Sequence, residues 1–412
     1  WKSISNINAY YDWDCDNINS CFKKSFQRAK REEELMESKL FNLSLSLKVI
    51  VGISIILWSF IALFPLLWVF IMSIKLPIDS FAANPLNVII GPNTLKQVGG
   101  LSLINFIFLC FSIYIYYKFF KSRDHYFLKI NNLTNNKLIS FLLLVLIFIA
   151  LFLVLFLFFN THIANFLNNI FKYIPFLKIL SKPLIGFTTQ HFIAVWSENE
   201  FYIQFLNTAM VTLGVVTISL TVGTLAGYAL SRSSSVIAFW LLVAALVFRA
   251  LPHSVLVTGY LELFIDYGLY GKKIAVIILL VAINQPFTIW MLRSFFMNIP
   301  QDLDEAAQID GCNPFQAFWM VIMPLMWPGV ITTGLFSFLL AYNDYLVCAL
   351  LLDGQSQTMV PAIMQYFNME TTMTDLVESI AAAASITLPL FILVMFFQKQ
   401  IVSGLTQGSV KG

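Results

Sequence analysis

Charged residues are scarce in this sequence of 412 residues, at 11%, whereas a soluble globular protein carries about a quarter. Hydrophobic residues make up 58%, and the mean hydropathy is +0.78. One soluble core cannot hide that much apolar surface from water, so the composition predicts an integral membrane protein. The net charge of +3 is too small to indicate binding to nucleic acid, and no nucleic-acid partner is expected.

Residues for metal, redox and catalytic chemistry are also few. The five cysteines and four histidines are scattered and form no C-x-x-C pair. We therefore expect neither a disulfide framework nor a metal site. The sequence lacks a phosphate-binding P-loop, a G-x-S-x-G serine motif and an H-E-x-x-H zinc motif. No catalytic residues and no cofactor are expected in this chain, so any nucleotide would have to bind elsewhere.

What the sequence does contain is long apolar runs. A helix of about 20 apolar residues crosses the hydrocarbon layer, and helix is the default because backbone polar groups in lipid must be satisfied within the segment. The runs lie near 49–74, 101–118, 138–160, 205–231, 236–262, 273–293, 325–350 and 378–398. The expected fold class is an all-α integral membrane protein with about eight transmembrane helices.

Basic residues near the ends of these runs predict the orientation. A basic cluster at 22–31 precedes the first run, and Lys121, Arg232 and Arg293 follow the second, fourth and sixth runs. This places both termini, and the loop after the sixth run, in the cytoplasm. The lysines at 272–273 disagree, since they would lie outside.

The runs differ in the size of their side chains. The run at 138–160 is almost purely Leu, Phe, Ile and Val, whereas the run at 205–231 is rich in small residues such as Gly214, Gly223 and Gly227. Small residues let membrane helices approach closely. We therefore expect the fourth run to be buried among other helices and the third to face lipid, which gives a six-helix core with a two-helix insertion.

Polar residues within the apolar runs are candidates for a translocation path, because a charge at the bilayer centre costs about 2.5–3.5 kcal/mol on insertion scales. Arg249 interrupts the fifth run, Asn284 and Gln285 the sixth, and Asn343 and Asp344 the seventh. Hydrogen bonding between helices is the alternative interpretation for these side chains, and both interpretations stay open.

The stretch 301–324 predicts a helix–turn–helix between the sixth and seventh runs. Good helix formers follow Pro300, with acidic residues in the favourable first turn. Gly311 stands where a helix needs a left-handed residue to stop. Asn and Pro at 313–314 then form an N-cap followed by a first helical residue. The second helix is expected to run to Pro324, where the next span begins.

This stretch resembles the E-A-A loop of the permease subunits of ABC importers. The matching residues are Glu305, Ala306, Ala307, Asp310, Gly311 and Pro324, while Val321 and Met323 replace the family's Ile and Leu. The small side chains of the alanine pair would suit close docking against another protein. The resemblance implies that the first helix of this loop enters a cleft of a cytoplasmic ATPase subunit and transmits its motion.

A second resemblance concerns the subfamily. The closing segment 398–412 is similar to that of carbohydrate permeases of the maltose-type G subunit, and the residues at 207–208 and 343–345 are similar to two of its signatures. The resemblance covers 46–85 and 183–412. It implies import of a carbohydrate, a loop before the last span that faces the binding protein, and a C-terminal tail near the ATPase pair.

The expected organisation has four parts. They are a cytoplasmic polar N-terminal segment at 1–45, a first core transmembrane helix at 46–85, an inserted two-helix segment at 86–182, and the remaining core at 183–412, which contains the coupling loop 294–324 and the C-terminal tail. The resemblance does not extend to the N-terminal segment or the insertion.

The expected function is that of a multi-pass permease subunit in the inner membrane, a transport subunit and not an enzyme, coupled to ATP hydrolysis through residues 301–324. The resemblance implies a second permease subunit, two cytoplasmic ATPase subunits that hold ATP and Mg, an external solute-binding protein and the lipid bilayer as partners. One alternative is an ABC permease for glycerol phosphate, a polyol or an amino acid. The others are a secondary transporter, which would need inverted repeats and ion ligands inside the membrane, and a membrane enzyme.

Overall fold

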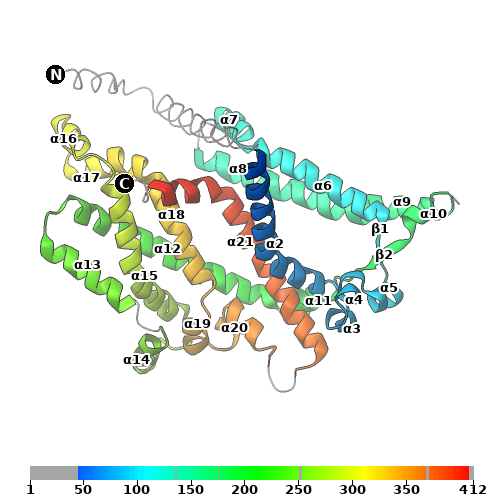
Figure 1. Cartoon of the computed structure of the whole chain (residues 1–412). Coiled ribbons are helices and arrows are strands. Elements are labelled where there is room, and N and C mark those ends of the chain that lie inside the picture. The colour runs from blue at the N-terminus through cyan, green and yellow to red at the C-terminus, as the bar shows by residue number, and fades with distance from the viewer. Residues whose placement is uncertain (1–44, 135–136, 175, 250–252, 368–370, 408–412) are drawn as a thin grey trace. The chain divides into compact units, whose positions relative to one another are not determined.

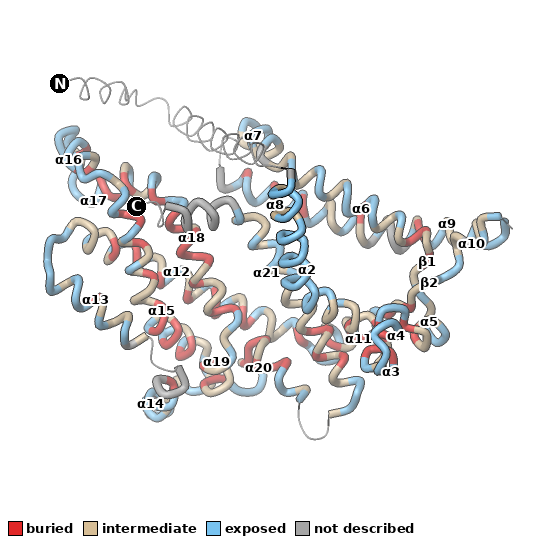
Figure 2. The backbone as a smooth tube through the Cα atoms, viewed as in Figure 1, coloured by how far each residue is buried: buried red, intermediate tan, exposed pale blue. Residues whose placement is uncertain are grey.

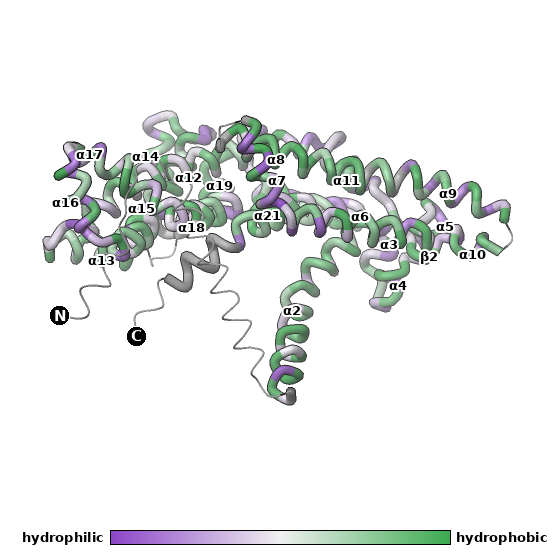
Figure 3. Tube along the Cα trace, turned by 90° about the horizontal axis from the view of Figure 1, so that it is seen from above, coloured by the Kyte–Doolittle hydropathy of each residue, from purple (hydrophilic) through white to green (hydrophobic). Residues whose placement is uncertain are grey.

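The computed structural model describes residues 45–134, 137–174, 176–249, 253–367 and 371–407, and nearly all of them lie in helices (Figure 1). The chain divides into two units, 1–67 and 68–412. In the first unit the described part belongs to α2 (Leu45–Ser73), an apolar helix coloured mostly hydrophobic in Figure 3, which ends in the second unit. The remaining elements belong to the second unit.

The long helices of the second unit match the expected apolar runs. They are α6 (Leu103–Lys121), α8 (Lys137–Phe152) continued by the π-helix η2 (Leu153–Ile163), α12 (Phe201–Arg232), α15 (Lys273–Phe296), α18 (Met323–Tyr342) preceded by the π-helix η4 (Ala317–Ile322), and α21 (Met373–Gln407). Together with α2, seven helices within the described ranges are long and apolar enough to cross a membrane. The all-α membrane fold is confirmed.

Within the described residues, the fifth expected run, 236–262, is seen as two shorter helices. It comprises α13 (Val236–Arg249) and α14 (His253–Asp266), of 14 residues each, too short to count as spans. Pro252 precedes α14 in the sequence and lies outside the described residues. The single span at 236–262 stays a prediction.

The fourth run is buried on one face. One face of α12 is lined by small and polar residues, among them Ser219, Gly223 and Gly227, and packs on α15. A Cβ atom on Gly223 would lie 2.6 Å from Cγ2 of Thr288, and one on Gly227 would lie 3.1 Å from the backbone nitrogen of Arg293. Glycine is therefore what allows the two helices to approach this closely. Buried residues gather along α15 and α18 in Figure 2.

The third run is mostly exposed, with a buried seam. Leu142, Leu146 and Ile149 are exposed, whereas Phe148 is buried. The Phe148 ring lies 4.9 Å from that of Phe119 on α6 and 5.4 Å from that of Phe396 on α21, measured between ring centroids. The insertion thus packs on the last long helix through aromatic side chains and presents its remaining face outward.

A two-stranded sheet closes the base of the insertion. Strand β1 (Gly100–Ser102) pairs antiparallel with β2 (Pro183–Gly186), and Gly100 lies opposite Gly186. A Cβ atom on Gly100 would lie 2.1 Å from the carbonyl oxygen of Ile185, so only glycine fits there. Between the strands, α6, α7 (Arg123–Thr134), α8, η2, α9 (Ala164–Phe171) and α10 (Lys178–Ser181) follow in order. The sequence boundaries of the inserted segment, 86–182, stay a prediction.

Short helices flank the sheet: α3 (Pro77–Ser80), α4 (Pro85–Ile90) and α5 (Pro92–Gln97) before it, and α11 (Gln190–Ile193) and the π-helix η3 (Ala194–Glu198) after it. Lys75 is fully buried and donates a hydrogen bond from Nζ to the carbonyl of Gly186. Asp79, also buried, accepts hydrogen bonds from the backbone nitrogen of Thr94 at 2.6 Å and from its hydroxyl at 2.7 Å. Burial lowers the pKa of Lys75 to about 8, although the charge of Asp79 opposes this.

Candidate functional site

Residues 301–324 form the expected helix–turn–helix. Helix α16 (Asp302–Ile309) is followed by Gly311 at φ +90°, the left-handed conformation that glycine tolerates. Helix α17 (Pro314–Gln316) then begins with a capping box, in which Asn313 and Gln316 each bind the other's backbone nitrogen. We call residues 301–324 the loop. The end of the helix bundle at which the loop lies is the loop end. The opposite end, where α12 begins, is the far end.

The second helix does not stop at Pro324. It continues from Pro314 through η4 into α18, so one helix of 29 residues leads from the loop to Tyr342. A proline leaves the carbonyl four residues earlier without its helical partner. The wider turns of η4 directly before Pro324 accommodate this, which explains why the proline does not separate the loop from the span.

The two alanines of the E-A-A pattern face opposite sides. Glu305 and Ala306 are exposed, but Ala307 is buried and packs inward. Residues four apart lie on the same face of a helix, so Ala307 shares the inner face with Leu303 and its neighbour Asp304. Of the two alanines, only Ala306 is exposed, and the docking role of the pair stays a prediction.

The loop also carries exposed large apolar side chains. Ile309 is 86% exposed and Phe315 is 68% exposed, and Trp319 and Met320 of η4 are exposed as well. We call these four residues the loop patch. Large apolar side chains grouped at a surface are typical of a binding interface.

The inner face of α16 is held by an ion pair. The Nε and Nη2 atoms of Arg232, the last residue of α12, lie 2.8 Å from Oδ2 of Asp304. The Tyr228 hydroxyl donates to the other carboxylate oxygen at 2.6 Å. Nη1 of Arg232 donates to the carbonyls of Phe296 and Ile299, at 3.2 Å and 3.1 Å, at the end of α15. The Arg232–Asp304 pair therefore joins three helices.

This pairing is absent from the sequence-based site. Arg232 serves there only as an orientation marker, and Asp304 only as an acid in the first turn of a helix. The sequence signal for the pair is weak: Arg232 follows the run at 205–231, and Asp304 lies near the start of the loop that follows the run at 273–293. Nothing in the sequence states that the two meet.

The candidate translocation residues lie on different elements and contact different neighbours. Asn284 is buried and donates to the hydroxyl of Ser337 on α18 at 2.7 Å, which is an interhelical hydrogen bond. Gln285 donates to the carbonyl of Ser219 on α12 at 3.4 Å. The geometry of these two residues matches the alternative of helix-to-helix bonding.

Arg249 ends α13, and its guanidinium carbon lies 4.6 Å from the centre of the Phe287 ring. Asn343 and Asp344 do not lie within a span, because α18 ends at Tyr342. Asp344 instead accepts hydrogen bonds from the backbone nitrogens of Val347 and Cys348, at 2.9 Å and 3.1 Å, and so caps α19 (Leu346–Leu351). Their role in translocation stays a prediction.

Two polar residues of α12 fasten the segment before the last long helix. Asn207 donates to the carbonyls of Gln355 and Gln357, at 2.7 Å and 2.9 Å. The hydroxyl of Thr208 accepts from the backbone nitrogen of Met359, the first residue of α20 (Met359–Met364), at 2.9 Å. Gln355 lies in the short 3-10 helix η5 (Gly354–Ser356). These bonds fix the path of the chain between α19 and α20.

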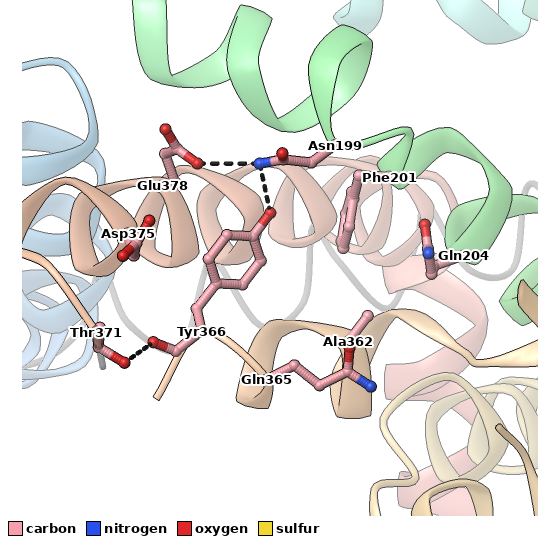
Figure 4. Close-up of a pocket in the computed structure, with 9 residues that line it drawn as sticks. All are labelled: Asn199, Phe201, Gln204, Ala362, Gln365, Tyr366, Thr371, Asp375 and Glu378. Atoms are coloured by element: carbon pink, nitrogen blue, oxygen red, sulfur yellow. Dashed lines mark hydrogen bonds between the residues drawn. The ribbon is translucent and has the colours of Figure 1, made fainter. Parts of the chain in front are cut away.

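A pocket of about 500 Å³ opens at the far end, between the start of α12, the end of α20 and the start of α21 (Figure 4). Asn199 donates to the Tyr366 hydroxyl at 2.9 Å and to a carboxylate oxygen of Glu378 at 3.0 Å. Burial raises the pKa of Tyr366, so its hydroxyl stays protonated at neutral pH. The rest of the polar lining consists of Gln204, Gln365, Thr371 and Asp375.

Within the described ranges, no group of three or more His, Cys, Asp or Glu side chains is placed to hold a metal. The geometry at hand is that of helices packed through small residues, with the helix–turn–helix loop at one end and a polar pocket at the other.

Comparison with known proteins identifies the family of this chain. Residues 219–407 match the family described as binding-protein-dependent transport system inner membrane component. The trehalose transport system permease protein of Mycobacterium tuberculosis is 32% identical over 226 residues, which are 55% of this chain and 82% of that protein. The chain belongs to this permease family. It is a transport component of the inner membrane that crosses the bilayer several times, and the loop lies wholly within the matched residues.

Other relatives carry similar names. The diacetylchitobiose uptake system permease protein of Streptomyces coelicolor is 31% identical over 58% of this chain and 87% of its own length. The trehalose/maltose transport system permease protein of Thermococcus litoralis is 31% identical over 57% of this chain and 85% of its own length. A solved bacterial ABC transporter involved in the import of alginate is similar at a TM-score of 0.46 and 21% identity, over 53% of this chain and 81% of that one.

Proposed function

We propose that this permease imports a carbohydrate and is driven by separate ATPase subunits that dock on the loop. The carbohydrate class is supported by the names of its relatives, which transport trehalose, maltodextrin and diacetylchitobiose. Glycerol phosphate, a polyol or an amino acid remains the alternative solute.

The observation that carries the coupling proposal is the loop patch. Ile309 and Phe315 are 86% and 68% exposed, and Ala306 on the same helix as Ile309 is exposed as well; large apolar side chains exposed near one another often mark a binding surface. A partner protein would bury this surface and come close to the backbone of α16 at Ala306. An ATPase subunit docked there would hold the ATP and Mg, since this chain has no P-loop.

This assignment also sets the orientation. With the loop in the cytoplasm, both termini lie on the cytoplasmic side and the far end lies outside. The partners are then a second permease subunit, two ATPase subunits at the loop end and a solute-binding protein at the far end. Tyr366, Asp375 and Glu378 of the far-end pocket offer an aromatic face and hydrogen-bonding oxygens, which suit the hydroxyl groups of a sugar.

The test is reconstitution of the complete transporter in liposomes, with uptake of labelled trehalose and maltose compared with glycerol 3-phosphate and an amino acid. In parallel, co-purification of the ATPase subunits is measured for Ile309→Asp and Phe315→Asp. We expect both variants to lose the ATPase subunits. The matched control is Tyr267→Asp, which places the same charge on a side chain that is 78% exposed outside the loop, and it should keep them.

Two results would contradict the proposal. Normal retention of the ATPase subunits by both patch variants would remove the coupling role of the loop. ATP-driven uptake of glycerol phosphate or an amino acid, with no uptake of any sugar, would remove the carbohydrate class and leave the coupling intact.

A further inference from the structure

The Arg232–Asp304 pair is the polar attachment of a small helix. Helix α16 has eight residues, and Asp302, Glu305, Ala306, Gln308 and Ile309 are all exposed. Its inward contacts come from Leu303, Asp304 and Ala307. Both carboxylate oxygens of Asp304 are occupied, one by Tyr228 and the other by Arg232. Besides the chain itself and the packing on η4, these contacts are what connect α16 to α12 and to the end of α15.

Arg232 divides its hydrogen bonds between two other elements. Its Nε and Nη2 face Asp304, and its Nη1 reaches the carbonyls at the end of α15. The planar guanidinium holds both sets in one fixed geometry, which a lysine ammonium cannot reproduce. The pair thus ties α16 to the ends of α12 and α15 at a single point.

Away from the Arg232–Asp304 pair, α12 and α15 pack closely against each other. Gly223 and Gly227 bring α12 against Thr288 and the backbone at Arg293, with no room for a Cβ atom on Gly223. Helix α12 has 32 residues, and at 1.5 Å per residue it is about 48 Å long. A displacement at Arg232 would therefore shift the far end, where Phe201 and Gln204 line the pocket, along with the loop end.

We propose that Arg232 and Asp304 are positioning residues that transmit movement of α16 to the α12–α15 pair, so that ATP hydrolysis drives transport. This inference rests on the proposed coupling function of the loop. It assigns the loop patch to holding the ATPase subunit and the Arg232–Asp304 pair to passing on its movement.

The test compares two conservative variants in the complete transporter in liposomes. Asp304→Asn keeps an oxygen that can accept from Tyr228 but removes the charge. Arg232→Lys keeps the charge but removes the planar fork. The readouts are co-purification of the ATPase subunits and sugar uptake per ATP hydrolysed. The control is Asp302→Asn, which neutralises an exposed acid two residues away on the same helix.

We expect both variants to assemble and to keep the ATPase subunits, while uptake per ATP falls about tenfold, the usual scale of a coupling between two sites. The control should match wild type. Because both residues act through one pair, uptake per ATP in the double variant Arg232→Lys/Asp304→Asn should be no lower than in the more impaired of the two single variants.

Three results would overturn the inference. Uptake per ATP equal to wild type in both variants would show that the pair transmits nothing. Loss of the ATPase subunits would reduce the pair to a structural support of α16. A double variant whose loss equals the product of the two single losses would show that the residues act independently. Failure of the proposed function is separate, because it is read from the patch variants in chains with an intact Arg232–Asp304 pair.

Discussion

Adding a large side chain at Gly223 should wedge α12 away from α15. The existing gap is too small even for one carbon, since a Cβ atom there would lie 2.6 Å from Thr288 Cγ2. Ordinary contact between carbon atoms is about 3.5–4.0 Å, so the helices would have to separate by about 1 Å. A gap of that size forfeits about a quarter to a half of the dispersion energy of the contacts that open. Overpacking of this kind typically costs about 1–3 kcal/mol, and more for several added carbons.

The perturbation is Gly223→Leu, and its control is Gly259→Leu on α14. A Cβ atom on Gly259 would meet nothing within 4 Å. Both changes gain the same helix propensity, about 0.8–1 kcal/mol, so the difference between them reports the packing alone. We expect Gly223→Leu to be at least about 3 kcal/mol less stable than the control.

The assay is thermal and denaturant unfolding of the purified chain in detergent micelles, followed by circular dichroism. A lower midpoint for Gly223→Leu than for Gly259→Leu is the expected result. Equal midpoints would refute the reasoning, because they would mean that α12 and α15 are not in close contact at Gly223.

Three further predictions concern single positions. Gly311→Ala should strain the left-handed turn by about 1–2 kcal/mol and weaken ATPase co-purification, while leaving the unfolding midpoint of the membrane helices nearly unchanged. Asn207→Ala removes the donor to the carbonyls of Gln355 and Gln357; it should destabilise the chain by about 1–3 kcal/mol and speed proteolysis after α19. The pKa of Lys75 is lowered to about 8, so the unfolded chain binds more protons between that value and 10.5, and stability should rise with pH across this window by at most about 3 kcal/mol. Lys75→Met should abolish that rise in unfolding measurements from pH 7 to 10.5.

The sequence was most informative where a local rule decides the structure. Seven of the expected spans are present because length and apolarity alone are enough to specify a membrane helix. The turn at Gly311 and the helix start at Asn313 follow from capping chemistry that acts within a few residues. The close packing of one face of α12 follows from its glycines, because small residues let membrane helices approach each other.

The features that could not be predicted depend on tertiary contacts. Ala307 and Ala306 are identical in sequence terms, and only the packing of α16 decides which one faces inward. Arg232 and Asp304 are 72 residues apart, so their pairing depends on how α12 and α16 meet. Asp344 could have been recognised as a cap of α19. The apolar residues on both sides of it made one continuous run, so the end of α18 at Tyr342 was not predicted.

The paired strands at the base of the insertion have a consequence for how this protein can be rebuilt. The chain leaves at Gly100 and returns at Gly186, directly opposite it in the sheet. Partners in such a pair are only about 5 Å apart, so a tight turn of a few residues could span the gap that now holds the whole insertion. Replacing the segment by such a turn would therefore leave the path of the following helices unchanged, and would uncover the face of α21 at Phe396 on which the insertion packs.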